Sequence, residues 1–195
     1  MIDLNGHTIT NTGERLRVQG AGNLTLKNGT LDDCGTYSGT TYKDKDFINI
    51  ANGASSAVVV IDNCDIIGNG FFMDIKGGSA TVKNSTFKQG GKKSGAFINA
   101  LAAGSSASIS VESCEIDVGS AYFITLNRAS SYTGAVQATV SVKDSTISTS
   151  GSLFGLQNTT SGAASSSYAI TVTGDSYLNY YLLLVWRSTF FLWRK

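Results

Sequence analysis

One six-residue pattern recurs along this chain and constrains its fold more than any other feature. The stretch VKNSTF at residues 82–87 has near-copies in LKNGTL (26–31), IDNCDI (61–66), VESCEI (111–116) and VKDSTI (142–147). Each copy reads apolar, charged, turn-forming, small, polar, apolar. A pattern that returns every 21 to 35 residues is typical of a repeat architecture, in which each repeat supplies one layer of a stack.

The positions around the turn-forming residue predict two strands and a bend in each layer. We take as anchors Asn28, Asn63, Asn84, Ser113, Asp144 and, less clearly, Gly174. Apolar residues precede the anchor by two and four positions and follow it by three, and a small residue comes directly after it. Apolar residues two apart mark a strand with one buried face, and a small residue past a turn marks a tight inner corner. We therefore expect a bend between two strands, then a second apolar strand and a Gly/Ser/Ala-rich return.

The residue before each anchor alternates in charge from repeat to repeat. The series is Lys27, Asp62, Lys83, Glu112 and Lys143. Parallel strands in neighbouring layers lie ~4.8 Å apart, so opposite charges in one column attract each other and like charges repel. The alternation predicts this stacking register. We interpret these acids, together with Asp65 and Glu115, as surface charges that set the register rather than as a metal or catalytic cluster.

With an Asn-type bend in its repeats and LNG in the opening stretch IDLNGHTIT, the chain resembles the parallel β-helix of the pectate-lyase-like superfold. It is closest in character to bacterial surface β-helix proteins. The resemblance spans roughly residues 2–185 and implies an all-β, single-stranded, right-handed parallel β-helix, a solenoid of about six to seven coils. The length suits one core, so we expect a single domain over residues 1–195, with an opening coil at 1–10 and an aromatic C-terminal coil or cap at 180–195.

Composition argues against several partners and cofactors. Fifteen Lys and Arg nearly balance 14 Asp and Glu, so no excess of positive charge is present to hold nucleic acid or an anionic membrane surface. The sequence has one histidine and no CxxC spacing, and we expect no metal site and no cofactor. Cys64 and Cys114 share a column two layers apart, ~9.6 Å, which exceeds the ~7 Å limit for a disulfide. We predict that both are reduced and buried.

The two ends of the chain carry further expectations. The start, MIDLNGHTIT, has neither a basic segment nor an apolar run of signal-peptide length. We therefore expect no signal peptide in the chain as given, which would be a cytosolic protein, a mature form or a fragment. The most apolar stretch is YLNYYLLLVWRSTFFLWRK at the C-terminus, but Arg187 interrupts it. The remaining runs are shorter than the ~20 residues that a membrane-spanning helix needs. We expect no membrane span, and we consider Tyr180–Trp193 a surface for self-association.

Two groups of residues are candidates for a site. LDDCG places Asp32 and Asp33 beside Cys34 and is similar to the DDC of polygalacturonases, which implies weak catalytic candidates for carboxylate chemistry. The family's other catalytic triplets, NTD, GHG and RIK, do not accompany it. Insertions in a solenoid tend to gather on one side and build a binding groove. The longest insertion, 32–47, therefore gives ligand-binding candidates, with a solvated charged loop as the alternative: Tyr37, Tyr42, Lys43, Asp44, Lys45 and Asp46.

These observations favour a non-catalytic surface or secreted β-helix module, either a structural stalk or an adhesin that contacts glycans, located outside the cell or at its surface. One alternative is a polysaccharide lyase or glycoside hydrolase that acts on an extended glycan, with its site around Asp32, Asp33 and residues 43–46. Ca²⁺ would be required only by the lyase. The second alternative is part of a tailspike-like trimeric fibre, for which Tyr180–Trp193 would supply the apolar flank. Polysaccharide is the partner that the resemblance implies.

Overall fold

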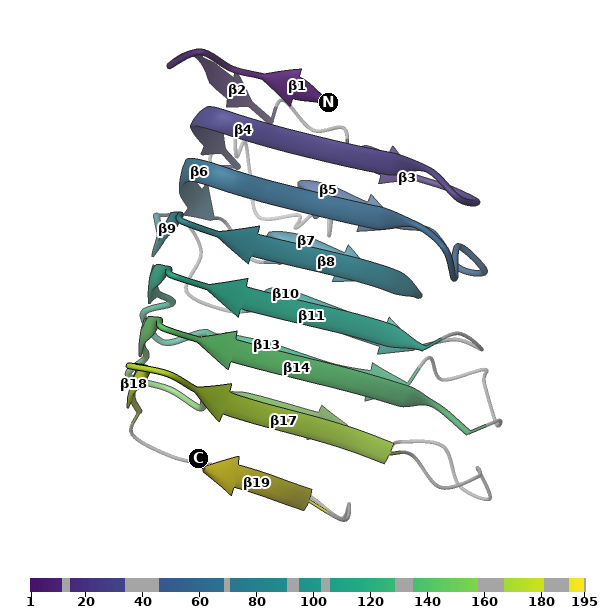
Figure 1. Ribbon diagram of the computed structural model, residues 1–195, viewed down its shortest axis with the longest axis vertical. Helices are drawn as coiled ribbons and strands as arrows, with labels where there is room; N and C mark the ends of the chain where they lie inside the picture. The colour runs from purple at the N-terminus through teal and green to yellow at the C-terminus, as the bar shows by residue number, and fades with distance from the viewer. Residues whose placement is uncertain are drawn as a thin grey trace, which may run out of the picture.

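The computed structural model describes residues 1–11, 15–33, 46–68, 71–90, 95–102, 106–128, 135–157, 167–180 and 190–194, and these residues form an all-β structure (Figure 1). The strands are β1 (Ile2–Asp3), β2 (Thr8–Thr10), β3 (Leu16–Val18), β4 (Asn23–Asp32), β5 (Ile48–Ile50), β6 (Val58–Gly68), β7 (Met73–Ile75), β8 (Gly78–Lys83), β9 (Thr86–Gln89), β10 (Ala96–Ala102), β11 (Ala107–Glu112), β12 (Glu115–Asp117), β13 (Tyr122–Arg128), β14 (Gln137–Lys143), β15 (Thr146–Ser148), β16 (Phe154–Gln157), β17 (Ser167–Thr173), β18 (Tyr177–Asn179) and β19 (Phe190–Arg194).

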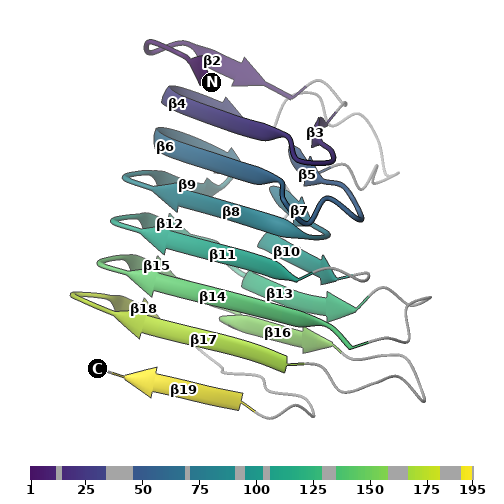
Figure 2. The same cartoon turned by 45° about the vertical axis from the view of Figure 1, so that its right-hand side comes forward.

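The strands assemble into two parallel sheets. The larger has 13 strands in the order β18-β15-β12-β9-β6-β8-β11-β14-β17-β19, with β1 and β2 paired to β4 and β4 paired to β6. The smaller has six strands in the order β16-β13-β10-β7-β5-β3. In Figure 2 the smaller sheet lies behind the long strands of the larger one, and the chain passes from one sheet to the other and back in each layer.

The expected single-stranded, right-handed parallel β-helix solenoid is wrong, and with it the resemblance to the pectate-lyase-like superfold. The larger sheet is instead curled into half a barrel, and the six-stranded sheet is its partner. Sequence reasoning placed a bend between two separate strands at each anchor. In the structure the ladder between β4 and β6 runs through the bend, from Asn23 opposite Val58 to Asp32 opposite Ile67. Because strand pairing continues on both sides of the bend, the two strands belong to one curved sheet.

The positions predicted around each anchor are confirmed. Val82 pairs with Val111 and Val111 with Val142, all at most 1% exposed. The anchors have left-handed backbone conformations, which Asn and Asp tolerate better than most residues: Asn28 (φ 60°), Asn63 (53°), Asn84 (51°), Ser113 (53°) and Asp144 (49°). The turn-forming residue therefore supplies the backbone geometry that curls the sheet.

Small side chains fill the inner corner after each bend. A Cβ on Gly29 would clash with the backbone carbonyl oxygen of His7, so only glycine fits there. In later layers a hydroxyl or thiol occupies the corner: Ser85 Oγ donates to the carbonyl of Lys83 at 2.6 Å. Cys64 and Cys114 are free and buried, as predicted. Burial raises the pKa of both thiols, which keeps them protonated and unreactive.

A stack of phenylalanine rings forms the centre of the core. Phe47, Phe72, Phe97 and Phe123 follow one another with ring centroids 5.5, 5.9 and 6.0 Å apart and nearly parallel planes. Phe154 continues the series edge-on at 5.9 Å. Each ring is at most 2% exposed, and each such pair contributes ~0.5–1.5 kcal/mol beyond its buried area. Phe87 of β9, in the larger sheet, lies 6.0 Å from Phe72 and 4.5 Å from Phe97, so the stack packs against the larger sheet.

The part of the chain that the structure describes contains no helix long and apolar enough to cross a bilayer. The C-terminal stretch is described in part: β19 pairs in parallel with β17, which places Phe190 opposite Tyr168. Residues 181–189 lie outside the described residues.

Candidate functional site

The exposed face of the larger sheet carries the alternating charges as ion pairs between layers. Lys83 Nζ lies 3.2 Å from Asp62 Oδ2, and Lys143 Nζ lies 3.2 Å from Glu112 Oε1. At the first layer Lys27 Nζ lies 3.0 Å from Asp3 Oδ2. These pairs confirm the predicted register, because each joins residues that face each other in neighbouring strands. Hydrogen bonds from Asn84 and Lys83 lower the pKa of Asp62, which is held as a carboxylate.

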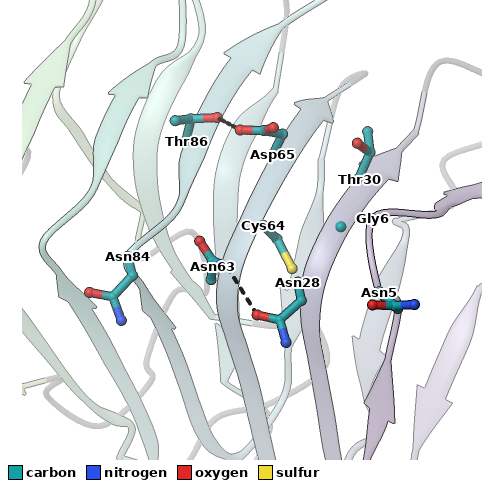
Figure 3. Close-up of a pocket in the computed structure, with 10 residues that line it drawn as sticks. Asn5, Gly6, Asn28, Thr30, Asn63, Cys64, Asp65, Asn84 and Thr86 are labelled. Atoms are coloured by element: carbon teal, nitrogen blue, oxygen red, sulfur yellow. Dashed lines mark hydrogen bonds between the residues drawn. The ribbon is translucent and has the colours of Figure 1, made fainter.

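A shallow polar groove of about 580 Å³ lies along the bends of the first layers (Figure 3). The corner residues Gly29 and Cys64 leave space in it, and its other lining residues are Asn5, Gly6, Asn28, Thr30, Asn63, Asp65, Asn84 and Thr86. The groove is therefore a consequence of the repeat, since the anchors form one side and the Thr/Asp column forms the other.

Side chains along the groove hydrogen-bond to one another across layers. Asn63 Nδ2 donates to Asn28 Oδ1 at 3.0 Å, and Thr86 Oγ1 donates to Asp65 Oδ1 at 2.7 Å (Figure 3). Asn28 in turn donates to Asp3 Oδ1 at 3.0 Å. These contacts connect four successive layers at the surface. A ligand in the groove would meet amide and hydroxyl groups that already have partners.

A second polar feature, which we call the polar row, is buried on the six-stranded sheet. It consists of Asn49, Asp74, Asn99 and Thr125, which occupy one register position on β5, β7, β10 and β13 and are 3–9% exposed. Asn49 Nδ2 and Asn99 Nδ2 donate to the two oxygens of Asp74 at 3.3 and 3.0 Å. Thr125 Oγ1 donates to Asn99 Oδ1 at 2.8 Å. The row is a chain of hydrogen bonds that links four strands beneath the surface.

Asp46 extends the polar row at its N-terminal end. Its carboxylate is 5% exposed, and its Oδ1 lies 3.5 Å from a guanidinium nitrogen of Arg15. Lys76 Nζ lies 3.6 Å from Asp74 Oδ2. Burial raises the pKa of Asp46. Burial, with the nearby charge of Asp46, raises the pKa of Asp74 to about 6. These two acids are the described carboxyl groups whose pKa is raised, and carboxyl groups with raised pKa values concentrate at functional sites.

The sequence-predicted site residues have different outcomes. Asp33 is 5% exposed and its Oδ1 accepts a hydrogen bond from Asn11 Nδ2 at 2.6 Å, whereas Asp32 is half-buried in β4. Asp46 lies in the polar row, and Asp32 and Asp33 lie at the end of a strand in the other sheet. Five ligand-binding candidates lie outside the described residues: Tyr37, Tyr42, Lys43, Asp44 and Lys45.

Sequence reasoning missed the rest of the polar row. Its signal is a single polar residue inside an otherwise apolar strand: Asn49 in FINI, Asp74 in FFMDI and Asn99 in AFINAL. Aligning these second strands with one another would have placed the three side chains in one column. Among the residues described, no group of three or more His, Cys, Asp or Glu side chains is placed to hold a metal ion.

Comparison of the chain with protein-family models, curated proteins and solved structures finds no match in any of the three. Neither these comparisons nor the structure supports a pectin-lyase-like solenoid, a cell-surface adhesin or a carbohydrate-binding protein. We therefore withdraw those interpretations.

Proposed function

We propose that this chain is a non-catalytic structural module. The observation that carries the proposal is the charge column on the larger sheet, in which Lys27, Lys83 and Lys143 are each paired with an acid of the layer before. Exposed ion pairs of this kind add little stability, but an alternating column penalises every register that brings like charges together. Their arrangement is suited to keeping strands in register.

The Asn and Thr contacts in the groove support the same proposal. Asn28, Asn63, Asp65 and Thr86 hydrogen-bond to groups in neighbouring layers. Each donor and acceptor engaged in this way is less available to a ligand. A stack held by contacts between successive layers suits a spacer or stalk, in which length and stiffness are the useful properties. A location outside the cytosol remains a prediction that goes with this role.

An enzyme assay tests the proposal against the catalytic alternative, in which Asp32, Asp33 or Asp46 would cleave a polysaccharide. Purified protein is incubated with acidic and neutral polysaccharides, with and without Ca²⁺, and both reducing ends and unsaturated products are measured. A structural module releases neither. Cleavage that Asp33→Asn or Asp46→Asn abolishes, and that the exposed control Asp175→Asn keeps, would overturn the proposal. Retention of the protein on a polysaccharide without cleavage would overturn a purely structural role.

Self-association is a second element of the proposed role. β19 is the last strand of the larger sheet, and β17 is its partner among the described strands. A strand edge without a neighbour is a template for a strand from another copy, and the segment Tyr180–Trp193, which overlaps β19, is rich in aromatic residues. Light scattering over a range of concentrations tests this element. A trimer would favour the fibre alternative, and a monomer at all concentrations would exclude self-association.

A further inference from the structure

The two buried carboxyl groups at the N-terminal end of the polar row share one amide. Asp46 lies two residues before β5, and Asp74 is the central residue of β7. Asn49 Nδ2 donates to Asp74 Oδ2 at 3.3 Å, and the Asn49 side chain also hydrogen-bonds to Asp46. Asp46 and Asp74 are 5% and 8% exposed. The amide thus holds two acids together where water has little access.

The oxygens of the two acids differ in their hydrogen bonds. Asp74 Oδ1 accepts from Asn99 and Asp74 Oδ2 accepts from Asn49. Asp46 Oδ2 is buried and has no hydrogen-bond partner. A buried acceptor without a donor loses its hydration and gains nothing in exchange. A proton on Asp46 would remove the buried negative charge that this oxygen carries.

The cations around the pair do not replace that donor. Arg15 and Lys76 approach at 3.5 and 3.6 Å with side chains about 30% exposed, farther than the ~2.7–2.9 Å of a charge-assisted hydrogen bond. Arg17, opposite Asn49 on β3, is exposed. On the other side β10 contributes the neutral Asn99 and β13 the neutral Thr125. The described neighbours therefore moderate the repulsion between the acids without satisfying Asp46 Oδ2.

We propose that Asp46 and Asp74 form a buried carboxyl pair that takes up one proton from solvent as the pH falls below neutrality, and that the loss of one of the two charges strengthens the contact of β5 with β7. No other bond forms or breaks. The pair makes the contact between β5 and β7, in the N-terminal part of the six-stranded sheet, sensitive to pH. This proposal does not depend on the proposed structural role.

The direction of the effect follows from linkage. The pKa of Asp74 is raised to about 6 in the folded protein from its ordinary value of 3.8, so the folded state binds the proton more tightly than the unfolded state does. The stabilisation is complete at a pH below the unfolded value and is lost as the pH rises through about 6. As the pH falls from 7 to 5, the ratio of protein with this part of the sheet folded to protein with it locally unfolded is expected to increase about tenfold.

Amide hydrogen exchange measures the local stability of the contact between β5 and β7. Ile48 N–H donates to the carbonyl of Phe72 at 3.1 Å, and Lys76 N–H donates to the carbonyl of Ile50 at 3.1 Å. Both hydrogen bonds join β5 or its end to the β7 segment. Their protection factors, which remove the intrinsic pH dependence of exchange, are measured at pH 5 and 7. Ser113 N–H, bonded to the carbonyl of Lys143 in the larger sheet at 3.0 Å, is the internal reference.

Protection at Ile48 and Lys76 should increase about tenfold from pH 7 to pH 5, with little change at Ser113. Asp74→Asn should remove this response and raise protection at pH 7, because the amide mimics the protonated acid, and Asp46→Asn is a second variant with the same expected loss of response. His7→Gln, which removes the one histidine, should keep the response. A response that survives in Asp74→Asn and Asp46→Asn, or that disappears in His7→Gln, would overturn the proposal. CaCl₂ at pH 7 tests a second possibility. If it stabilises the protein and Asp46→Asn removes that stabilisation, the pair binds a cation rather than a proton, and the proposal is also overturned.

Discussion

At the bends of the larger sheet we expect a glycine variant to be more stable than an alanine variant, which is the reverse of the order in an ordinary strand. Asn63 is exposed and has φ 53°, and its side chain donates one hydrogen bond, to Asn28. Asn63→Ala and Asn63→Gly both lose that bond, so the difference between them reports the backbone alone. Alanine costs ~1–2 kcal/mol in the left-handed conformation, and glycine costs ~0.5–1 kcal/mol in chain entropy. The glycine variant should be the more stable by about 0.5–1 kcal/mol.

Lys88 is the matched control because it is exposed in β9 and its backbone is not left-handed. At this position alanine causes no backbone strain, and Lys88→Ala should be more stable than Lys88→Gly by ~0.5–1 kcal/mol. Urea unfolding of the four variants, followed by both tryptophan fluorescence and far-UV circular dichroism, gives the four free energies and tests whether unfolding is two-state. If Asn63→Ala matches or exceeds Asn63→Gly, the left-handed bend does not determine which residues the anchor accepts, and the reasoning fails.

Three further substitutions test the other contacts of the repeat. Gly29→Ala should cost ~1–3 kcal/mol by overpacking, since its Cβ would clash with the backbone carbonyl of His7, and thermal unfolding would detect the loss. Lys83→Asp should destabilise the stack by placing an acid beside Asp62, and the loss should shrink in 1 M NaCl, where charges more than ~3 Å apart are screened. Phe97→Ala, in the middle of the ring stack, should cost ~3–5 kcal/mol in urea unfolding, and a loss below 1 kcal/mol would show that the stack is not a main source of stability.

The layered organisation could be predicted because it is determined by local chemistry. Asn63 tolerates a left-handed bend, Gly29 fits a closed corner, and Lys83 pairs with an acid of the preceding layer. Each of these requirements can be inferred from the residue type. Whether the sheet continues through the bend is decided by hydrogen bonds between layers, for which the side chains carry no signal. The solenoid prediction was wrong at that point.

The polar row could not be predicted because its members come from strands at variable distances from the anchors. Asp46 was considered as part of a charged insertion, and nothing in DKDF indicates that this acid, rather than the one two residues earlier, packs beside β5. Its surroundings include Arg15, which precedes β3 in the neighbouring layer, and Asn49 of β5. The residue type made Asp46 a candidate, but its burial and its raised pKa arise from tertiary packing.

The buried and exposed columns differ in what their charges do. On the exposed face Asp62 and Lys83 neutralise each other in water, and their charges have a structural purpose, the register. In the polar row Thr125 donates to Asn99, as does Asn127 of the same strand, and these neutral hydrogen bonds link neighbouring strands without burying a charge. An asparagine at position 74 could accept from one neighbouring amide and donate to the other after a flip of that amide, so the hydrogen bonds of the row do not require a carboxylate. The negative charge that Asp74 carries above about pH 6 therefore costs free energy, and the hydrogen bonds of the row do not explain why an acid stands there. If this residue has a role beyond structure, that role lies in its titration.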